Sequence, residues 1–88
     1  MTIKRDDSFG MPCPTRVFID GAPVADVYKT EKIVIFVKHG DRIISARSIG
    51  VCGTGIAEVR TNFKADEKMT FRIGYSKNGE INIAPTAF

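Results

Sequence analysis

The chain has 88 residues, enough for one small domain and too few for two. Its hydrophobic fraction of 43% and charged fraction of 26% are ordinary for a folded domain, and no apolar run is long enough for a membrane-spanning helix. Thirteen Lys and Arg stand against ten Asp and Glu; because the two signs are interspersed, the net charge of +3 argues against a dedicated polyanion groove.

We expect residues 1–14 to be the partly irregular segment of a single domain that spans 1–88. Residues 2–6 could form a short strand in which Ile3 is the only apolar residue. The charged run 4–7 is typical of a solvated segment rather than a site. Cys13 lies between two prolines, which hold the backbone extended in a loop.

A β-hairpin is predicted around Asp20-Gly21. The pair follows the β-formers 17–19, and a type I′ turn needs positive φ at both central residues, which suits Asp-Gly. The return strand is predicted over 22–28. Because Pro23 cannot donate to a ladder, this return strand is expected at the edge of a sheet or with Pro23 facing outward.

The run Ile33 to Val37 is apolar without interruption, which predicts a strand covered on both faces. His39-Gly40 is the next predicted turn, and 42–49 returns as a strand. These segments, with the hairpin before them, form the stretch against which the later strands are expected to lie.

The second half of the chain continues with strands. Three glycines within 50–55 mark a loop or sharp bend. Two segments then alternate with period two, 56–63 and 69–75, and Asn78-Gly79 predicts another hairpin. No segment shows helical periodicity. The sequence therefore predicts an all-β fold, a small antiparallel β-sandwich of seven or eight strands, with a small barrel as the alternative.

The two cysteines, Cys13 and Cys52, favour a disulfide over free thiols, and both of these over a metal or catalytic role. They are not in Cys-x-x-Cys spacing, and His39 is the only histidine to join them in a metal site. Both lie in Pro- or Gly-flanked loops, outside the apolar faces where a buried free thiol would sit. A disulfide would imply an oxidising compartment.

No group of residues predicts catalysis. Gly50, Gly53 and Gly55 form G-x-x-G-x-G, which is not a nucleotide-binding fingerprint, and no helix follows to receive a phosphate. His39 has no identifiable partner in the sequence. We therefore expect no catalytic residue, no metal, no cofactor and no enzymatic activity.

Two surfaces remain as candidates for binding. The first is the edge of the predicted return strand, since sheet edges bind extended peptides; it comprises Ala22, Pro23, Val24 and Asp26. The second is a basic sheet face, which would suit single-stranded nucleic acid; it comprises Arg47, Arg60 and Arg72. Alternation places Phe63, Phe71 and Tyr75 on the opposite, core-facing side, so a solvated face is the favoured interpretation of these arginines.

The segments VFIDGAPVADVY and EKIVIFVKHGDRIISAR resemble a pattern of small β domains of the bacterial cell envelope, namely PEGA-type domains and some short lipoproteins of unknown function. The lipoproteins also share features at Cys13, Cys52-Gly53, 71–73 and Pro85-Thr86. The chain departs from the PEGA pattern in lacking a Gly-aromatic pair, and from the lipoproteins in carrying Thr30 where Gly is usual and in having no lipobox. The resemblance implies an envelope location and a binding or scaffolding role, without catalytic residues.

The expected function is a non-enzymatic domain of the periplasm or cell envelope that binds a protein or cell-wall partner. The opening residues MTIKRDDSFG lack an apolar segment, and the expected location is compatible with a signal or lipid anchor upstream of residue 1. The alternative is a cytoplasmic nucleic-acid-binding module that uses the basic face.

Overall fold

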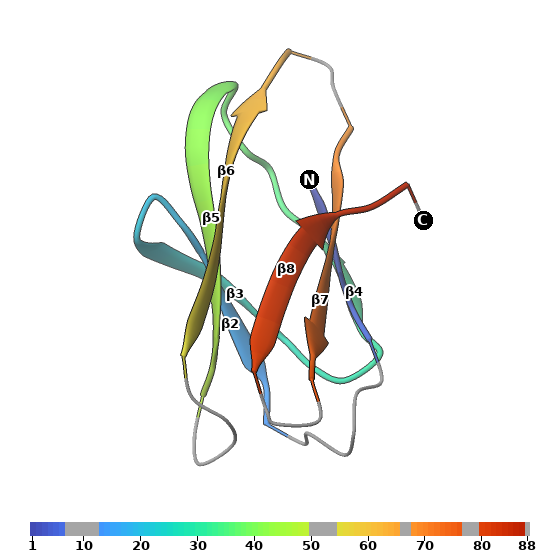
Figure 1. The fold of residues 1–88 in the computed structure, drawn as a ribbon. Helices are drawn as coiled ribbons and strands as arrows, with labels where there is room; N and C mark the ends of the chain where they lie inside the picture. The colour runs from blue at the N-terminus through green and yellow to red at the C-terminus, as the bar shows by residue number, and fades with distance from the viewer. Residues whose placement is uncertain (7–12, 50–54, 66–67, 77–79, 88) are drawn as a thin grey trace.

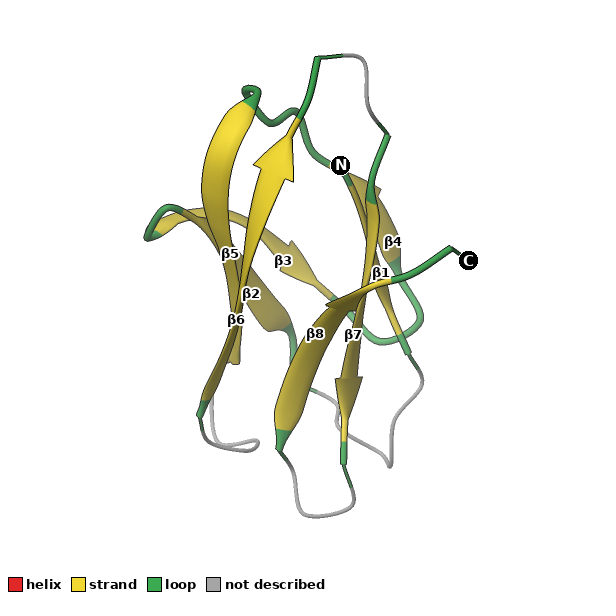
Figure 2. Ribbon diagram, turned by 45° about the horizontal axis from the view of Figure 1, so that its top comes forward, coloured by secondary structure: helices red, strands yellow, loops and turns green. Residues whose placement is uncertain are grey.

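The computed structural model describes residues 1–6, 13–49, 55–65, 68–76 and 80–87, and within these ranges the chain forms eight strands and no helix (Figures 1 and 2). The strands are β1 (Thr2–Arg5), β2 (Thr15–Ile19), β3 (Ala22–Val27), β4 (Lys32–Val34), β5 (Gly40–Ser48), β6 (Ile56–Phe63), β7 (Thr70–Tyr75) and β8 (Ile81–Pro85).

The strands form two four-stranded sheets that face each other (Figure 1). One has the order β4-β1-β7-β8 and the other β3-β2-β5-β6; we call them the β1 sheet and the β2 sheet. The all-β sandwich prediction is confirmed, and in the described part of the chain the sheets do not close into a barrel.

One pair of neighbours departs from the antiparallel prediction. Strands β1 and β7 are parallel, with Ile3 opposite Phe71, whereas the other neighbouring pairs are antiparallel. A parallel pair needs a long crossover connection. Here most of the chain lies between the two strands, so periodicity within either strand could not have indicated their relative direction.

The core lies between the inner faces of the two sheets. Ile3, Phe71 and Ile73 from the β1 sheet and Val17 and Ile44 from the β2 sheet have no exposed surface. The predicted alternation within 56–63 and 69–75 is confirmed, since every second side chain turns inward. Full burial of such side chains between the sheets is the main source of stability in a domain of this size.

Local turn chemistry is also as predicted. Asp20 and Gly21 have φ of 51° and 84°, as a type I′ turn requires.

The turn that carries the chain from the β2 sheet to the β1 sheet has another left-handed residue that is not glycine, Thr30, at φ 60°. Such a conformation is unusual for a β-branched side chain. It is held by hydrogen bonds from Glu31 N to Tyr28 O (3.0 Å) and from Tyr28 N to Glu31 Oε1 (3.0 Å).

Arg5 corrects the expectation that the first charged run is solvated. Its exposure is 4%, because it follows Ile3 by two positions and so shares the inner face of β1. Its guanidinium donates to Val27 O (2.9 Å) and Cys13 O (2.7 Å) and lies 5.3 Å from the centre of the Tyr75 ring. Arg5 thereby connects the β1 sheet to the end of β3.

Candidate functional site

The two sheets have four edge strands between them, β3 and β6 in the β2 sheet and β4 and β8 in the β1 sheet. An edge strand presents unpaired N–H and C=O groups, and proteins prevent unwanted pairing there with charges, prolines and bulges. On β6 the outward face begins with Ile56, which is 55% exposed, and continues with the polar Glu58, Arg60 and Asn62. Strand β8 ends in the exposed Pro85. The comparison of β3 with β4 shows which edge is better suited to pair with an added strand.

Strand β3 lies at an edge, as Pro23 predicted. Of the predicted interaction residues, Ala22, Pro23 and Val24 are exposed, and Asp26 is half-buried in an ion pair with Arg16 (2.9 Å). The pairing with β2 shifts at Val24, which has no partner there and forms a bulge.

The bulge and the proline both make β3 a poor template for another strand. Asp20 N donates to Ile43 O, so the even-numbered residues of β2 direct their backbone groups toward β5. Phe18 is one of these, and its partner Pro23 therefore directs its own backbone away from β2, toward open solvent. A residue without N–H stands where an added strand would need a donor.

Strand β4 has β1 on one side and, among the described residues, no strand on the other. Arg5 N donates to Glu31 O (3.1 Å), Ile35 N donates to Met1 O (2.8 Å), and Met1 N donates to Ile35 O (2.9 Å). The backbone N–H and C=O groups of the odd-numbered residues in this segment therefore point toward β1. By alternation, the N–H and C=O groups of Lys32, Val34 and Phe36 point to the open side.

The side chains on this edge correct the prediction of a strand covered on both faces over 33–37. Ile33, Ile35 and Val37 are half-buried against the core, whereas Val34 is 76% exposed and Phe36 is 87% exposed. The uninterrupted apolar run reflects an inner face that packs on the core and an outer face that nothing described covers. The regular strand also ends earlier, at Val34, although the exposure alternates beyond it.

Phe36 lies between two shallow hollows. One has a volume of about 380 Å³ and is lined by residues that include Met1, Val37 and Phe63. The other has a volume of about 400 Å³ and extends to Val24 on β3. Both hollows also have charged residues in their lining, Lys64 in the first and Asp20, Lys38 and Arg42 in the second.

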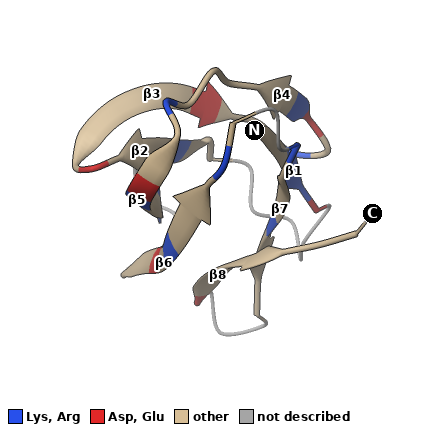
Figure 3. Ribbon diagram, turned by 90° about the horizontal axis from the view of Figure 1, so that it is seen from above, with Lys and Arg blue, Asp and Glu red and all other residues tan. Residues whose placement is uncertain are grey.

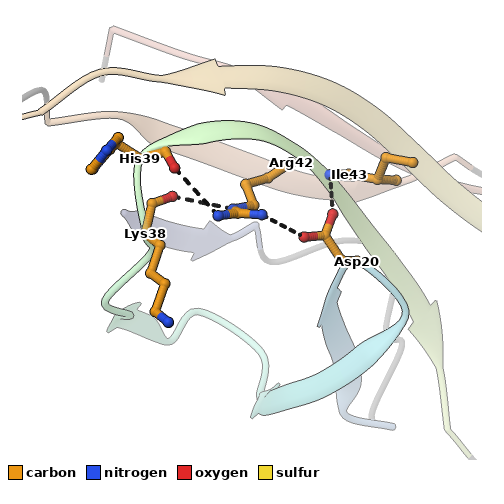
Figure 4. Close-up of polar contacts among 5 residues, drawn as sticks. All are labelled: Asp20, Lys38, His39, Arg42 and Ile43. Atoms are coloured by element: carbon orange, nitrogen blue, oxygen red, sulfur yellow. Dashed lines mark hydrogen bonds and ion pairs between the residues drawn. The ribbon is translucent and has the colours of Figure 1, made fainter.

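The segment that follows Phe36 is held by Arg42 (Figure 4). Arg42 donates from Nε to Lys38 O (3.2 Å) and from Nη2 to His39 O (3.3 Å), and its Nη1 lies 3.1 Å from Asp20 Oδ2. Asp20 Oδ1 accepts from Ile43 N (2.9 Å). That backbone donor, followed by Arg42, lowers the pKa of the Asp20 carboxyl. Sequence analysis missed this cluster, whose only local signal was the Asp of the hairpin turn.

The predicted basic face is wrong in one of its three members. Arg47 on β5 and Arg60 on β6 are exposed on the outer face of the β2 sheet, but Arg72 is on β7 in the other sheet, where it pairs with Asp6 (2.7 Å). Arg47 and Arg60 are themselves offset by four positions, about 13 Å along the strands. Basic segments are accordingly spread over both sheets (Figure 3).

The cysteine pairing cannot be followed through both residues. The carbonyl of Cys13 accepts the Arg5 hydrogen bond, but Cys52 lies outside the described residues, as do Gly50 and Gly53. The disulfide therefore stays a prediction. Within the described ranges, no three His, Cys, Asp or Glu side chains come together as a metal site. His39 is exposed at the turn before β5.

Comparisons of the chain with protein families, with curated proteins and with solved structures find no match. In the ranges that the structure covers, no helix has the length and apolar character needed to cross a membrane. The geometry of the chain itself makes the β4 edge the strongest candidate for a binding site.

Proposed function

We propose that this chain is a non-enzymatic binding module of the cell envelope, which binds a protein chain by strand addition at the β4 edge. The observation that carries the proposal is the outward direction of the backbone groups at Lys32 and Val34, which alternation extends to Phe36, combined with apolar side chains that are 76% and 87% exposed at Val34 and Phe36. In strand addition, main-chain hydrogen bonds supply affinity and alternate side chains supply specificity.

The fixed position of the edge supports recognition of an extended segment. Arg42 and Asp20 hold the chain immediately after Phe36, and Ile33 and Ile35 hold β4 against the core. A binding edge that is already ordered loses little conformational entropy when a partner adds to it.

The envelope location rests on the sequence resemblance, and one turn in the structure agrees with that resemblance. The position at which the similar lipoproteins usually carry Gly is Thr30, and this residue adopts φ 60°, a conformation that Gly takes without strain. The same turn chemistry is thus required here, although the residue differs. The predicted Cys13–Cys52 disulfide would agree with an oxidising compartment.

The binding surface is tested by pull-down from a cell-envelope extract with three full-length baits, the wild type, Val34→Pro and Ala22→Arg. Val34→Pro removes an outward N–H from β4, whereas Ala22→Arg alters the β3 edge. We expect the proteins bound by wild type and Ala22→Arg to be lost with Val34→Pro. Loss with Ala22→Arg and retention with Val34→Pro would assign binding to β3 instead. Circular dichroism verifies that each bait is folded.

The compartment is tested separately, by rapid alkylation of thiols in the native cells followed by intact mass measurement. We expect Cys13 and Cys52 to escape alkylation. Two alkylated cysteines would contradict the envelope location, because they indicate a reducing compartment.

A further inference from the structure

We propose that the protein chain bound at the β4 edge is a second copy of this chain. The two β4 strands pair antiparallel about a two-fold axis at Val34, which joins two β1 sheets into one continuous sheet. This inference rests on the proposed function, since it uses the same edge and names the occupant.

The sequence of the edge is self-complementary. Residues 32–36 read Lys-Ile-Val-Ile-Phe, and the central Ile-Val-Ile is the same in both directions. With Val34 opposite Val34 of the second copy, Ile33 lies opposite Ile35 on the inner face. On the outer face Lys32 lies opposite Phe36, where its alkyl stem covers the exposed ring and its ammonium adds a cation–π contact.

The alternating direction of the backbone N–H and C=O groups along β4 fits this two-fold pairing. The groups that point away from β1 belong to Lys32, Val34 and Phe36, and the two-fold pairing places these same residues opposite one another. Each such pair can exchange N–H···O=C bonds in both directions, as the hydrogen-bonded pairs of an antiparallel ladder do. The donors and acceptors of one edge that no described residue pairs with are therefore satisfied by the other edge.

Pairings shifted by one or two residues from this register bring less compatible side chains together. A shift of one residue would place outer-face side chains opposite inner-face ones. A shift of two in one direction places Lys32 opposite Lys38 of the second copy, twice over, which is repulsive. A shift of two in the other direction places Phe36 opposite Thr30, at the turn where φ is 60° and the strand has ended.

The assembly closes at two copies. Each β4 edge is used once, and the new outer edges are formed by the two β8 strands, which carry the exposed Pro85. The pairing covers Val34 and Phe36. Of the edges that stay open among the described strands, β3 and β8 carry prolines, and β6 has one exposed large apolar side chain, Ile56, followed by Glu58, Arg60 and Asn62. Because a ladder of this length buries a small area, we expect a weak and reversible dimer.

The experiment is sedimentation velocity on the full chain from about 10 µM to about 1 mM, the range in which weak interfaces associate. We expect the wild type to pass from monomer to dimer and Val34→Pro to stay monomeric. Val24→Thr, which changes an exposed apolar residue on β3, is the matched control and should dimerise as the wild type does.

Two substitutions at Phe36 test the register. In the proposed pairing, Phe36→Glu faces Lys32 of the second copy and keeps the dimer, whereas Phe36→Lys places two like charges together and weakens it about tenfold or more relative to Phe36→Glu. Equal dimerisation constants for the two variants would overturn the register.

A wild type that is monomeric throughout, or a Val34→Pro variant that dimerises equally, would overturn the self-pairing. The failure of this inference is distinguishable from failure of the proposed function. A monomeric wild type whose pull-down still depends on Val34 would remove the second copy as the occupant and retain the β4 edge as a binding surface.

Discussion

Strands β3 and β4 follow each other in the chain and both lie at sheet edges, but they differ in how the edge is built. On β3, Pro23 withholds a donor and the bulge at Val24 interrupts the ladder. On β4, Val34 is an exposed apolar side chain on a strand without bulge or proline, and Phe36 continues the exposed apolar surface two residues beyond the strand. The topology places both strands at edges, and side-chain chemistry then decides which edge can accept another strand.

The largest change in stability is expected when proline substitutions at two adjacent positions, Ile33 and Val34, are compared. Ile33→Pro removes an N–H that faces β1, so we expect the free energy of unfolding to fall by about 3 kcal/mol or more. Val34→Pro removes an N–H that faces outward, and we expect a loss below about 1 kcal/mol. Urea denaturation at low protein concentration measures both. Equal losses of unfolding free energy would contradict the assignment of the Ile33 N–H to the β1 side and of the Val34 N–H to the open side.

The next largest loss of stability is expected from a substitution of Arg5. This residue connects β1 to the end of β3, and β1 is the strand that supports β4. Arg5→Met leaves the Val27 and Cys13 carbonyls without their charged donor, and we expect it to lower the free energy of unfolding by about 2 to 3 kcal/mol. Lys4→Met, on the outer face of the same strand, is the control and should change stability by less than about 0.5 kcal/mol. A similar loss in both variants would mean that the buried contacts of Arg5 add no stability.

A third change should convert β3 into an open edge. Pro23→Val restores an outward donor, and deletion of Val24 removes the bulge, so that the strand pairs regularly with β2. In a Val34→Pro background, which blocks β4 and is expected to stay monomeric, we expect these changes to produce self-association at concentrations at which the parent variant shows none. Light scattering across a concentration series follows this change. If the variant folds and association is unchanged, Pro23 and the bulge are not what protects the edge.

The smallest effect is a pH dependence at the hairpin that precedes β3. The pKa of Asp20 is lowered in the folded state by the Ile43 N–H and by Arg42, so its contribution is fully present above the pKa of the unfolded chain. That contribution is lost as the pH falls through the lower, folded-state pKa. We therefore expect the stability gap between wild type and Asp20→Asn to be constant at neutral pH and to narrow below about pH 4. Thermal unfolding across an acid series measures the gap, and one that persists unchanged at the lowest pH would exclude the charge as its source.

Sequence reasoning was most successful where the information is local. The alternation in 56–63 and 69–75 reports which side chains share a face, because period two is a property of a single strand. The Asp20-Gly21 turn was equally predictable, since its two positive φ angles are required by the hairpin itself. It failed for the 33–37 run and for Arg72, because composition does not tell which strands become neighbours.

The sequence by itself therefore determined the fold class, the turns and the inward faces of most strands, because these depend on residues within a few positions of one another. Only the tertiary structure decided that β1 and β7 run parallel, that Arg5 is buried, and that β4 lies at an open edge. Each of these depends on contacts between residues far apart in the chain. The candidate site belongs to the second group, since an edge is defined by the neighbour that a strand lacks among those described.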